Sequence, residues 1–206
     1  MEITDLSEQL RFIKRSLRGV MNGIVSTSMR DKGLNYKVNF GVELPRLQQM
    51  AQELPHTYEL AAALWKEDIR ECRLLAGMLM PVERMDAELA EIWVESMRFV
   101  EEAECTVMHL FCRTEWASSK AFEWIASADE MHELCGYLLL ARLFMQQAIP
   151  SERDEQEFLD QVRTALQDGT PAVRRAAGKA VVKFMDLGEA QEQAAEAILY
   201  GETPAN

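Results

Sequence analysis

The feature that most constrains this sequence is an apolar periodicity of three and four residues that recurs along most of its length. One stripe runs through Leu6, Leu10, Ile13, Leu17 and Ile24, and others run through residues 89–100, 134–148 and 173–184. Spacing of this kind places a wide apolar face on one side of an α-helix. No segment alternates with period two for long enough to predict a sheet, and residues 38–42, the one candidate strand, are interpreted as loop.

Caps and helix breakers divide the chain into ten or eleven predicted helices. Pro45 suits a first helical turn, and Thr170 before Pro171 is a typical N-cap. Ser151 and Asp154 have the spacing of a capping box. The predicted helices lie near residues 3–25, 45–53, 56–65, 67–80, 86–103, 105–113, 115–126, 128–148, 152–167, 171–186 and 189–200. Because the loops between them are short, consecutive helices are expected to be antiparallel neighbours.

A weak internal repeat favours a stacked array of helical hairpins over a simple bundle. The similar segments are residues 70–77, 132–136 and 173–178. Gly136 and Gly178 lie 42 positions apart, within the range of HEAT-type repeats, whereas Gly77 and Gly136 lie 59 apart. The repeat is therefore irregular. Since glycine weakens a helix interior, we expect close helix packing at these positions.

Length and composition are those of a globular protein. The chain has 206 residues, of which 48% are hydrophobic, enough for one continuous core. We expect residues 1–200 to form a single helical-repeat domain and residues 201–206 to be a short disordered tail. The N-terminus does not resemble a signal peptide, and the apolar runs are too short to span a bilayer. These features predict a soluble, cytoplasmic protein with no membrane partner.

The charge pattern argues against strong nucleic-acid binding. The formal net charge is −12, whereas phosphate neutralisation needs a basic surplus. Basic residues gather in residues 1–38, and the remainder of the chain is strongly acidic. A smaller basic stripe consists of Arg174, Arg175, Lys179 and Lys183. This stripe is interpreted first as a solvated helix face and second as a DNA contact.

The cysteines predict reduced, buried thiols rather than disulfides or a metal site. They are Cys72, Cys105, Cys112 and Cys135. Cys105, His109 and Cys112 have i, i+4 and i+7 spacing, which would place them on one helix face with Glu101 or Glu102 nearby. A buried apolar stripe explains the same positions better than zinc, so no metal and no cofactor are expected. Motifs of nucleophilic hydrolases and of phosphate-binding loops are also missing.

Three ordered segments resemble a known family. They are NFGVELPRLQQMA at residues 39–51, LW with ECRLLA at 64–76, and PAVRRAAGKA at 171–180. Together they resemble segments of the AlkD-like DNA alkylation repair proteins, over residues 35–190. The resemblance implies an all-α, armadillo-like fold: a HEAT-like α-α superhelix, which is a right-handed solenoid of antiparallel helical hairpins. In active members the concave face cradles duplex DNA, and cationic alkylated purines such as 3-methyladenine or 7-methylguanine are excised.

The resemblance also implies where an active site would lie. Active members use an aspartate flanked by tryptophans, and an arginine that holds a phosphate. An anion there stabilises the positive charge that develops on the sugar and orients a water, and tryptophan faces attract the cationic base. The aspartate is expected a few residues after Trp93, near Met97 or Arg98, and the arginine within residues 131–134. Lys179 stands where the last repeat of the family has tryptophan. Only Trp93 is retained, as a candidate DNA contact.

These substitutions lead to three hypotheses. The first is a family member that lacks the usual excision activity and binds duplex DNA weakly or not at all. The second is a helical-repeat scaffold that holds a protein ligand in its concave face. The third, ranked lowest, is a glycosylase with a shifted catalytic carboxylate, supplied by Glu95, Glu101 or Glu102. The predicted helix at residues 86–103 is strongly acidic, which disfavours phosphate near it.

Overall fold

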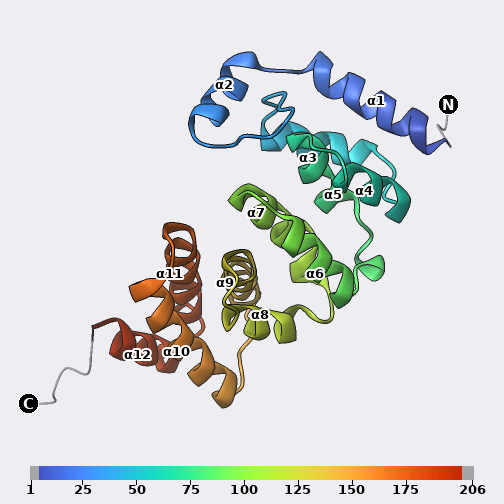
Figure 1. Ribbon diagram of the computed structural model, residues 1–206. Coiled ribbons are helices and arrows are strands. Elements are labelled where there is room, and N and C mark those ends of the chain that lie inside the picture. Colours follow the sequence, from blue (N-terminus) through green and yellow to red (C-terminus); the bar gives the residue numbers. More distant parts are fainter. Residues whose placement is uncertain (1–4, 201–206) are drawn as a thin grey trace, which may run out of the picture. The chain divides into compact units, whose positions relative to one another are not determined.

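A computed structural model describes residues 5–200 of the protein; the predicted tail at residues 201–206 lies outside the described residues. Within residues 5–200 the chain forms twelve α-helices and two short 3₁₀ helices (Figure 1). The α-helices are α1 (Leu6–Gly19), α2 (Gly23–Asp31), α3 (Leu44–Glu53), α4 (Tyr58–Trp65), α5 (Arg70–Leu79), α6 (Ala87–Ser96), α7 (Val100–His109), α8 (Ala117–Ile125), α9 (Glu130–Met145), α10 (Glu152–Asp168), α11 (Pro171–Met185) and α12 (Glu189–Tyr200). The 3₁₀ helices are η1 (Val82–Arg84) and η2 (Phe111–Arg113).

The helices fall into two compact units, residues 1–85 and residues 86–206, which we call the N-terminal unit and the C-terminal unit. A single isolated bridge, between Val38 and Ile69, is the only β-pairing in the described part of the chain. The prediction of loop for residues 38–42 is thus confirmed. No helix among the described residues has the length and apolarity needed to cross a bilayer.

In the N-terminal unit, α5 is the central helix. It packs against α3 and α4, and α1 packs against α4. All ten residues of α5 are buried, including three charged ones. Arg70, Glu71 and Arg73 are 4%, 0% and 8% exposed. Charged groups at such depth need partners, because an unpaired buried charge is strongly destabilising.

The partner of Glu71 is the backbone of the loop before α3. Its Oε2 accepts a hydrogen bond from the Phe40 amide and its Oε1 from the Val42 amide, each at 3.1 Å. Arg70 donates from Nη1 to the Val42 carbonyl at 2.8 Å and lies 3.3 Å from Glu71 Oε1. Two of the segments that carry the family resemblance, one in this loop and one in α5, are therefore joined directly.

Gly41, between the two amides held by Glu71, allows this loop to approach α2. Its φ of +70° is favourable only for glycine, and an added Cβ would clash with the Asn22 carbonyl and lie 2.6 Å from the Ser26 amide. Asn22 also donates its backbone N–H to the Phe40 carbonyl at 2.8 Å. The start of α2 and the loop before α3 thus form one backbone contact.

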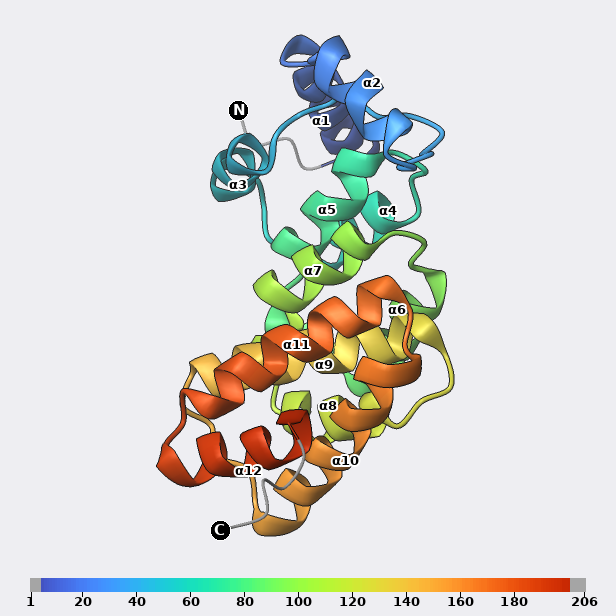
Figure 2. The same ribbon diagram turned by 90° about the vertical axis from the view of Figure 1, so that its left-hand side faces the viewer.

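In the C-terminal unit, α9 is the central helix. It packs against α7, α8 and α11, and α11 packs in turn against α10 and α12. Figure 2 shows α9 and α11 side by side. Phe144, Phe158 and Phe184 join α9, α10 and α11, with ring centroids 5.1–5.4 Å apart. Consecutive hairpins are stacked here through a shared apolar core.

Two glycines of the internal repeat, Gly136 and Gly178, lie in this unit, and only Gly136 is at a close contact between helices. A Cβ on Gly136 would lie 2.7 Å from the Ile125 amide, so α8 and α9 approach closely there, as the sequence predicts. At Gly178 a Cβ would meet nothing within 4 Å, so the prediction of close packing at Gly178 is wrong.

The predicted helix at residues 3–25 is two helices. Asn22 begins α2, since its Oδ1 accepts a hydrogen bond from the Val25 amide at 3.2 Å. Ile13 and Leu17 are fully buried as the stripe predicts, but Ile24 lies beyond the break and is 85% exposed. The apolar repeat therefore does not extend beyond α1.

The predicted helix at residues 86–103 is also interrupted, between α6 and α7. Met97 ends α6 in an extended conformation. Glu102, in the first turn of α7, reaches back and accepts a hydrogen bond from the Arg98 amide at 2.8 Å, an arrangement that caps α7. The caps predicted at Ser151 and Thr170 are confirmed by hydrogen bonds from the Asp154 and Val173 amides. The break between α6 and α7 matters for the candidate site.

Candidate functional site

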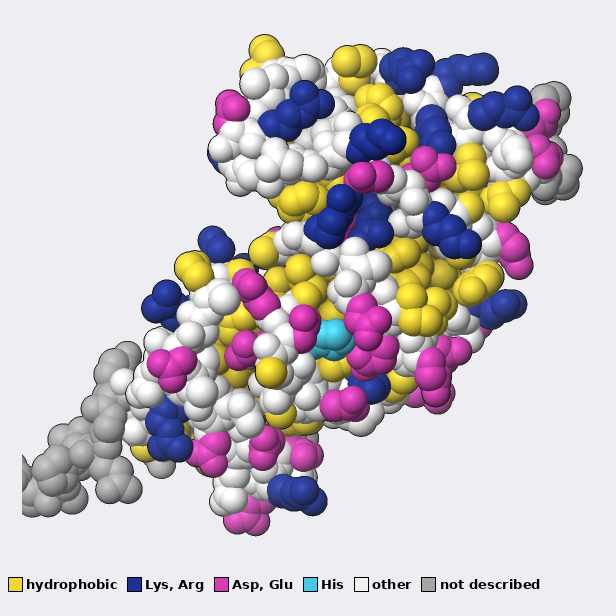
Figure 3. All heavy atoms as spheres, in the orientation of Figure 1, with side chains coloured by type: hydrophobic (Ala, Val, Ile, Leu, Met, Phe, Trp, Pro, Cys, Tyr) yellow, Lys and Arg dark blue, Asp and Glu magenta, His cyan; other side chains and the backbone are white. Residues whose placement is uncertain are grey.

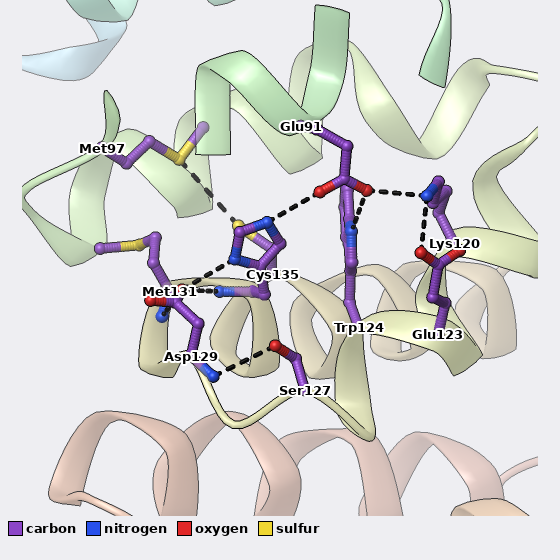
Figure 4. A network of polar contacts seen from close by, with 10 residues as sticks. Glu91, Met97, Lys120, Glu123, Trp124, Ser127, Asp129, Met131 and Cys135 are labelled. Atoms are coloured by element: carbon purple, nitrogen blue, oxygen red, sulfur yellow. Dashed lines mark hydrogen bonds and ion pairs between the residues drawn. The ribbon is translucent and has the colours of Figure 1, made fainter. Parts of the chain in front are cut away.

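The catalytic aspartate is expected near Met97 or Arg98, and both residues lie at the break between α6 and α7. The Met97 side chain is buried, at 6% exposure. The Cys135 thiol of α9 contacts its Sδ at 4.0 Å (Figure 4). Burial raises the pKa of Cys135, so the thiol is neutral. The position therefore holds two soft, uncharged sulfur groups in place of an anion.

Trp93, the retained tryptophan, is 2% exposed and belongs to the core of the C-terminal unit. In this conformation its indole is not accessible to a base. Arg98, the other residue near the expected aspartate position, is exposed, and its guanidinium lies 5.4 Å from the centre of the Phe99 ring.

The three carboxylates considered as shifted catalytic groups differ in their surroundings. Glu95 is exposed on the last turn of α6 and makes no hydrogen bond or ion pair within residues 5–200. Glu101 is half-buried in the first turn of α7. Glu102 is 1% exposed and is engaged in capping α7. The catalytic role of each stays a prediction.

The segment expected to supply the arginine, residues 131–134, contains no arginine, and His132 makes its polar side-chain contacts. Its Nε2 lies 2.8 Å from Glu91 Oε2, and its Nδ1 lies 2.8 Å from Asp129 Oδ1. The imidazole is thus held between two carboxylates, and its side chain is only 12% exposed. Asp129 is also the N-cap of α9, and the hydrogen bond from His132 lowers the pKa of Asp129.

Glu91 connects this histidine to α8. Its Oε1 accepts hydrogen bonds from Trp124 Nε1 and Lys120 Nζ, both at 2.8 Å (Figure 4). We call Glu91, Lys120, Trp124, Asp129 and His132 the Glu91 cluster. Burial alone would raise the pKa of Glu91, but hydrogen bonds from Lys120, Trp124 and His132 outweigh it and hold that pKa below its ordinary value. Glu91 is therefore a carboxylate at neutral pH.

Aromatic rings surround the buried side of the cluster. Trp124 is 1% exposed, and its ring centroid lies 5.8 Å from Phe111, 5.9 Å from Trp116 and 6.0 Å from His132. Trp124 thus packs against rings from η2 and α9 as well as against Trp116. Both oxygens of Glu91 are occupied by donors from this framework, so the cluster fastens α6, α8 and α9 together. Glu91 is not predicted by the sequence, because its partners Trp124 and His132 lie 33 and 41 positions away.

The basic stripe of α11 is largely exposed, but half of it is paired with acidic residues. Lys179 Nζ lies 3.8 Å from Glu104 Oε1, and Lys183 Nζ lies 2.7 Å from Asp186 Oδ2. Arg174 and Arg175 are exposed and make no hydrogen bond or ion pair within the described residues. These two arginines are the cations of the stripe that remain available to an anion.

A shallow depression lies over α7, α9 and α11 beside this stripe. Its lining residues include Val100, Glu104, Leu138, Arg175 and Lys179. Its volume is about 10 Å³, which holds about one water molecule. An extruded nucleobase does not fit there in this conformation.

The candidate metal ligands do not share one helix face. Because α7 ends at His109, Cys112 lies in η2, and the predicted alignment with Cys105 is wrong. Among residues 5–200, no group of three or more His, Cys, Asp or Glu side chains is arranged to hold a metal ion. All four cysteines are free and buried, which confirms the prediction of buried thiols.

Comparison with known proteins identifies both a family and a fold. The sequence model of the family described as "DNA alkylation repair enzyme" matches residues 13–194. A solved structure, described as "a new family of proteins related to the HEAT-like repeat DNA glycosylases with affinity for branched DNA structures", superposes with a TM-score of 0.82 at 17% sequence identity. The match covers 91% of this chain and 80% of the other. No curated protein matches the chain. The predicted HEAT-like helical fold is confirmed.

Proposed function

The chain belongs to the DNA alkylation repair enzyme family, and on that premise we propose that it binds DNA, branched structures in particular, and does not excise alkylated bases. The observation that carries the second half of the proposal is Met97, buried against Cys135 at the position of the expected aspartate. Base excision develops positive charge on the sugar and needs a positioned water. A thioether carries no charge and is a weak hydrogen-bond acceptor, so it serves neither purpose.

The neighbouring carboxylates support the same conclusion. Glu102 caps α7 through the Arg98 amide, and Glu91 accepts hydrogen bonds from three side chains. Moving either carboxylate toward a substrate would break these contacts. Glu95 is exposed and makes no hydrogen bond or ion pair within the described residues, and Glu95 and Glu101 remain the alternative sources of a shifted carboxylate.

DNA binding is supported by family membership and by the relative of similar fold that has affinity for branched DNA. On the C-terminal unit the proposed contacts are Arg174 and Arg175, whose guanidinium groups lack partners within the described residues. Lys179 and Lys183 contribute less, because Glu104 and Asp186 compete with phosphate for them. A surface of this kind binds phosphate weakly and with a small salt dependence.

An excision assay tests the first part of the proposal. Duplex DNA treated with a methylating agent is incubated with the full chain, and released 3-methyladenine and 7-methylguanine are quantified. We expect release at the rate of the protein-free control. Release above that rate, lost in one of Glu95→Gln, Glu101→Gln or Glu102→Gln, would overturn the proposal and establish the shifted carboxylate.

A binding titration tests the second part. Fluorescence anisotropy compares a four-way junction with a linear duplex of the same total length, at several salt concentrations. We expect tighter binding of the junction and a linear fall of log K with log salt. Binding to neither DNA would refute the proposal and leave the protein-scaffold hypothesis in its place.

A further inference from the structure

The N-terminal unit carries a second basic surface, on α1. Burial of Ile13 and Leu17 fixes which side of α1 faces the core. Arg11, Arg15 and Arg18 lie at i, i+4 and i+7 on the exposed side. A rise of about 1.5 Å per residue spreads these three positions over about 10 Å of helix.

Within residues 5–200 these arginines have no carboxylate partners, although another cation of the same helix does. Lys14 Nζ lies 2.6 Å from Glu67 Oε1 and ties α1 to the end of α4. Arg15 and Arg18 make no hydrogen bond or ion pair within the described residues. The contact of Arg11 that the structure shows is a hydrogen bond from its Nε to the Ser7 carbonyl. The positive charge of this face is therefore not neutralised within residues 5–200.

More unpaired cations follow on α2 and in the loop after it. The side chains of Arg30, Lys32 and Lys37 are exposed and make no hydrogen bond or ion pair within the described part of the chain. Figure 3 shows Lys and Arg side chains gathered over α1 and α2, with few acidic side chains among them. This clustering of one sign of charge is the electrostatic footprint of a phosphate-binding surface.

Exposed apolar side chains are interleaved with the arginines. Phe12, one helical turn before Arg15, is 49% exposed. At the turn into α2, Met21 and Ile24 are 57% and 85% exposed. A regular duplex offers no apolar face to such groups, but an open branch point does, because the base pairs at its centre lose a stacking neighbour. Aromatic rings stack on exposed bases irrespective of their sequence.

We propose that the outer face of α1 binds branched DNA, with Arg11, Arg15 and Arg18 on the phosphates and Phe12 against a base pair exposed at the branch. The inference rests on the proposed function and adds a second binding surface to it. This surface lies in the N-terminal unit, whereas α11 lies in the C-terminal unit. Over the length of these three arginines one strand presents about three phosphates, at roughly 3.4 Å each along the axis. The match in spacing allows each guanidinium its own phosphate.

A basic helix with exposed apolar groups could also lie on an anionic membrane, but α1 lacks the feature that such binding needs. Interfacial helices insert a continuous apolar face into the lipid. The continuous apolar face of α1 contains Ile13 and Leu17, which are 0% exposed in the unit core. What remains outside is Leu6 at the start of α1, Phe12 among the arginines, and the turn that follows, which do not form a continuous apolar face. Charge complementarity to phosphate with a single stacking ring therefore favours DNA.

The test uses the full chain with the junction and duplex described above. Arg15→Gln with Arg18→Gln removes two phosphate contacts, so the slope of log K against log salt is expected to decrease by about 2 for both DNAs. Phe12→Ala is expected to weaken junction binding on the order of tenfold and to leave duplex binding unchanged. Arg153→Gln is the matched control, because Arg153 is exposed and unpaired within the described residues but lies on α10. Circular dichroism verifies that each variant is folded.

The outcomes separate this inference from the function on which it rests. If the wild type binds neither the junction nor the duplex, the proposed function and the α1 surface are both refuted. If the wild type binds and the double variant keeps its affinity and slope while Arg174→Gln with Arg175→Gln loses them, only the α1 surface is refuted. Equal loss of junction and duplex binding in Phe12→Ala would refute the stacking contact. Vesicles of phosphatidylserine supply the lipid arm: binding to them, and not to DNA, that the α1 variants abolish would replace DNA by a membrane.

Discussion

The two units of this protein differ sharply in charge. Residues 1–85 contain 12 Lys and Arg against 11 Asp and Glu, a net charge of +1, whereas residues 86–206 contain 10 against 23, a net charge of −13. The formal charge of −12 for the whole chain hides this partition. The net charge of the whole chain therefore argues against nucleic-acid binding, whereas the net charge of the N-terminal unit does not. For a repeat protein, the charge of each unit is the more informative quantity.

The units also use their key carboxylates differently. In the N-terminal unit Glu71 is fully buried and binds two backbone amides. In the C-terminal unit Glu91 is part-exposed and binds side chains of α8 and α9. Loss of Glu71 should therefore destabilise the fold of its unit, whereas loss of Glu91 should weaken only the local contact between α6, α8 and α9.

Glu71→Ala should destabilise the protein most. It leaves the Phe40 and Val42 amides without their acceptor and Arg70 without its carboxylate, a loss of about 3–5 kcal/mol in the free energy of unfolding. Urea denaturation followed by circular dichroism measures it. Glu53→Ala, at an exposed position on α3, is the control and should change stability by less than about 0.5 kcal/mol. A similar small loss for both variants would contradict the role of Glu71.

Alanine at two glycines should have opposite effects. In Gly136→Ala the new Cβ meets the Ile125 amide at 2.7 Å, which should cost about 1–3 kcal/mol of stability by overpacking. In Gly178→Ala the Cβ enters open space, and the better helix propensity of alanine should stabilise the protein by roughly 0.5–1 kcal/mol. Thermal unfolding measures both changes, with a lower melting temperature expected for Gly136→Ala and a higher one for Gly178→Ala. A shift in the same direction would show that helix spacing at Gly136 does not limit the packing.

The Glu91 cluster should make stability depend on pH. The pKa values of Glu91 and Asp129 are lowered in the folded protein, so their contribution is present above their ordinary values near about 4 and is lost as pH falls through the lowered folded-state values. The part-exposed positions limit the effect to about 1 kcal/mol or less. Unfolding free energies between pH 7 and pH 3 should fall less steeply for Glu91→Gln than for the wild type. Parallel curves would show that Glu91 is not protonated in this interval.

The thiols should be inert in both units of the native protein. Burial, followed by repulsion from Glu67, raises the pKa of Cys72 to about 12, and burial raises the pKa of Cys112 and Cys135 as well. Reaction with a chromogenic disulfide reagent at pH 8 should be undetectable before unfolding and should reach four thiols per chain in denaturant. Rapid labelling of one thiol in the native state would locate a unit that opens independently.

Local signals in the sequence predicted helices and caps well. Ser151 and Thr170 act through residues three positions away, so their hydrogen bonds follow from short motifs. The break at Met97 was missed because it contains neither glycine nor proline, and it depends on Glu102 folding back to the Arg98 amide. The cap at Asn22 was not predicted, because the apolar spacing continues past it to Ile24 and indicates one uninterrupted helix.

The candidate site was predictable only in part. The resemblance directs attention to Met97 and Arg98 and to the segment that contains His132, because both lie at a fixed distance from neighbouring motifs. It did not identify Glu91, since the contacts to Trp124 and His132 join residues from three helices. Contacts between distant helices are set by the packing of the repeats, which no local pattern in one sequence encodes.

The way in which Glu71 holds the loop before α3 has a consequence for mutational tolerance. Its two acceptor oxygens bind main-chain amides, which every residue except proline possesses. Exchanges at Phe40 and Val42 in a saturation library should therefore leave the attachment intact, with proline as the exception, while the burial of Val42 at 2% exposure limits that position to apolar side chains. Glu71 itself should accept almost no replacement, so the anchor and the segment it anchors should evolve at very different rates.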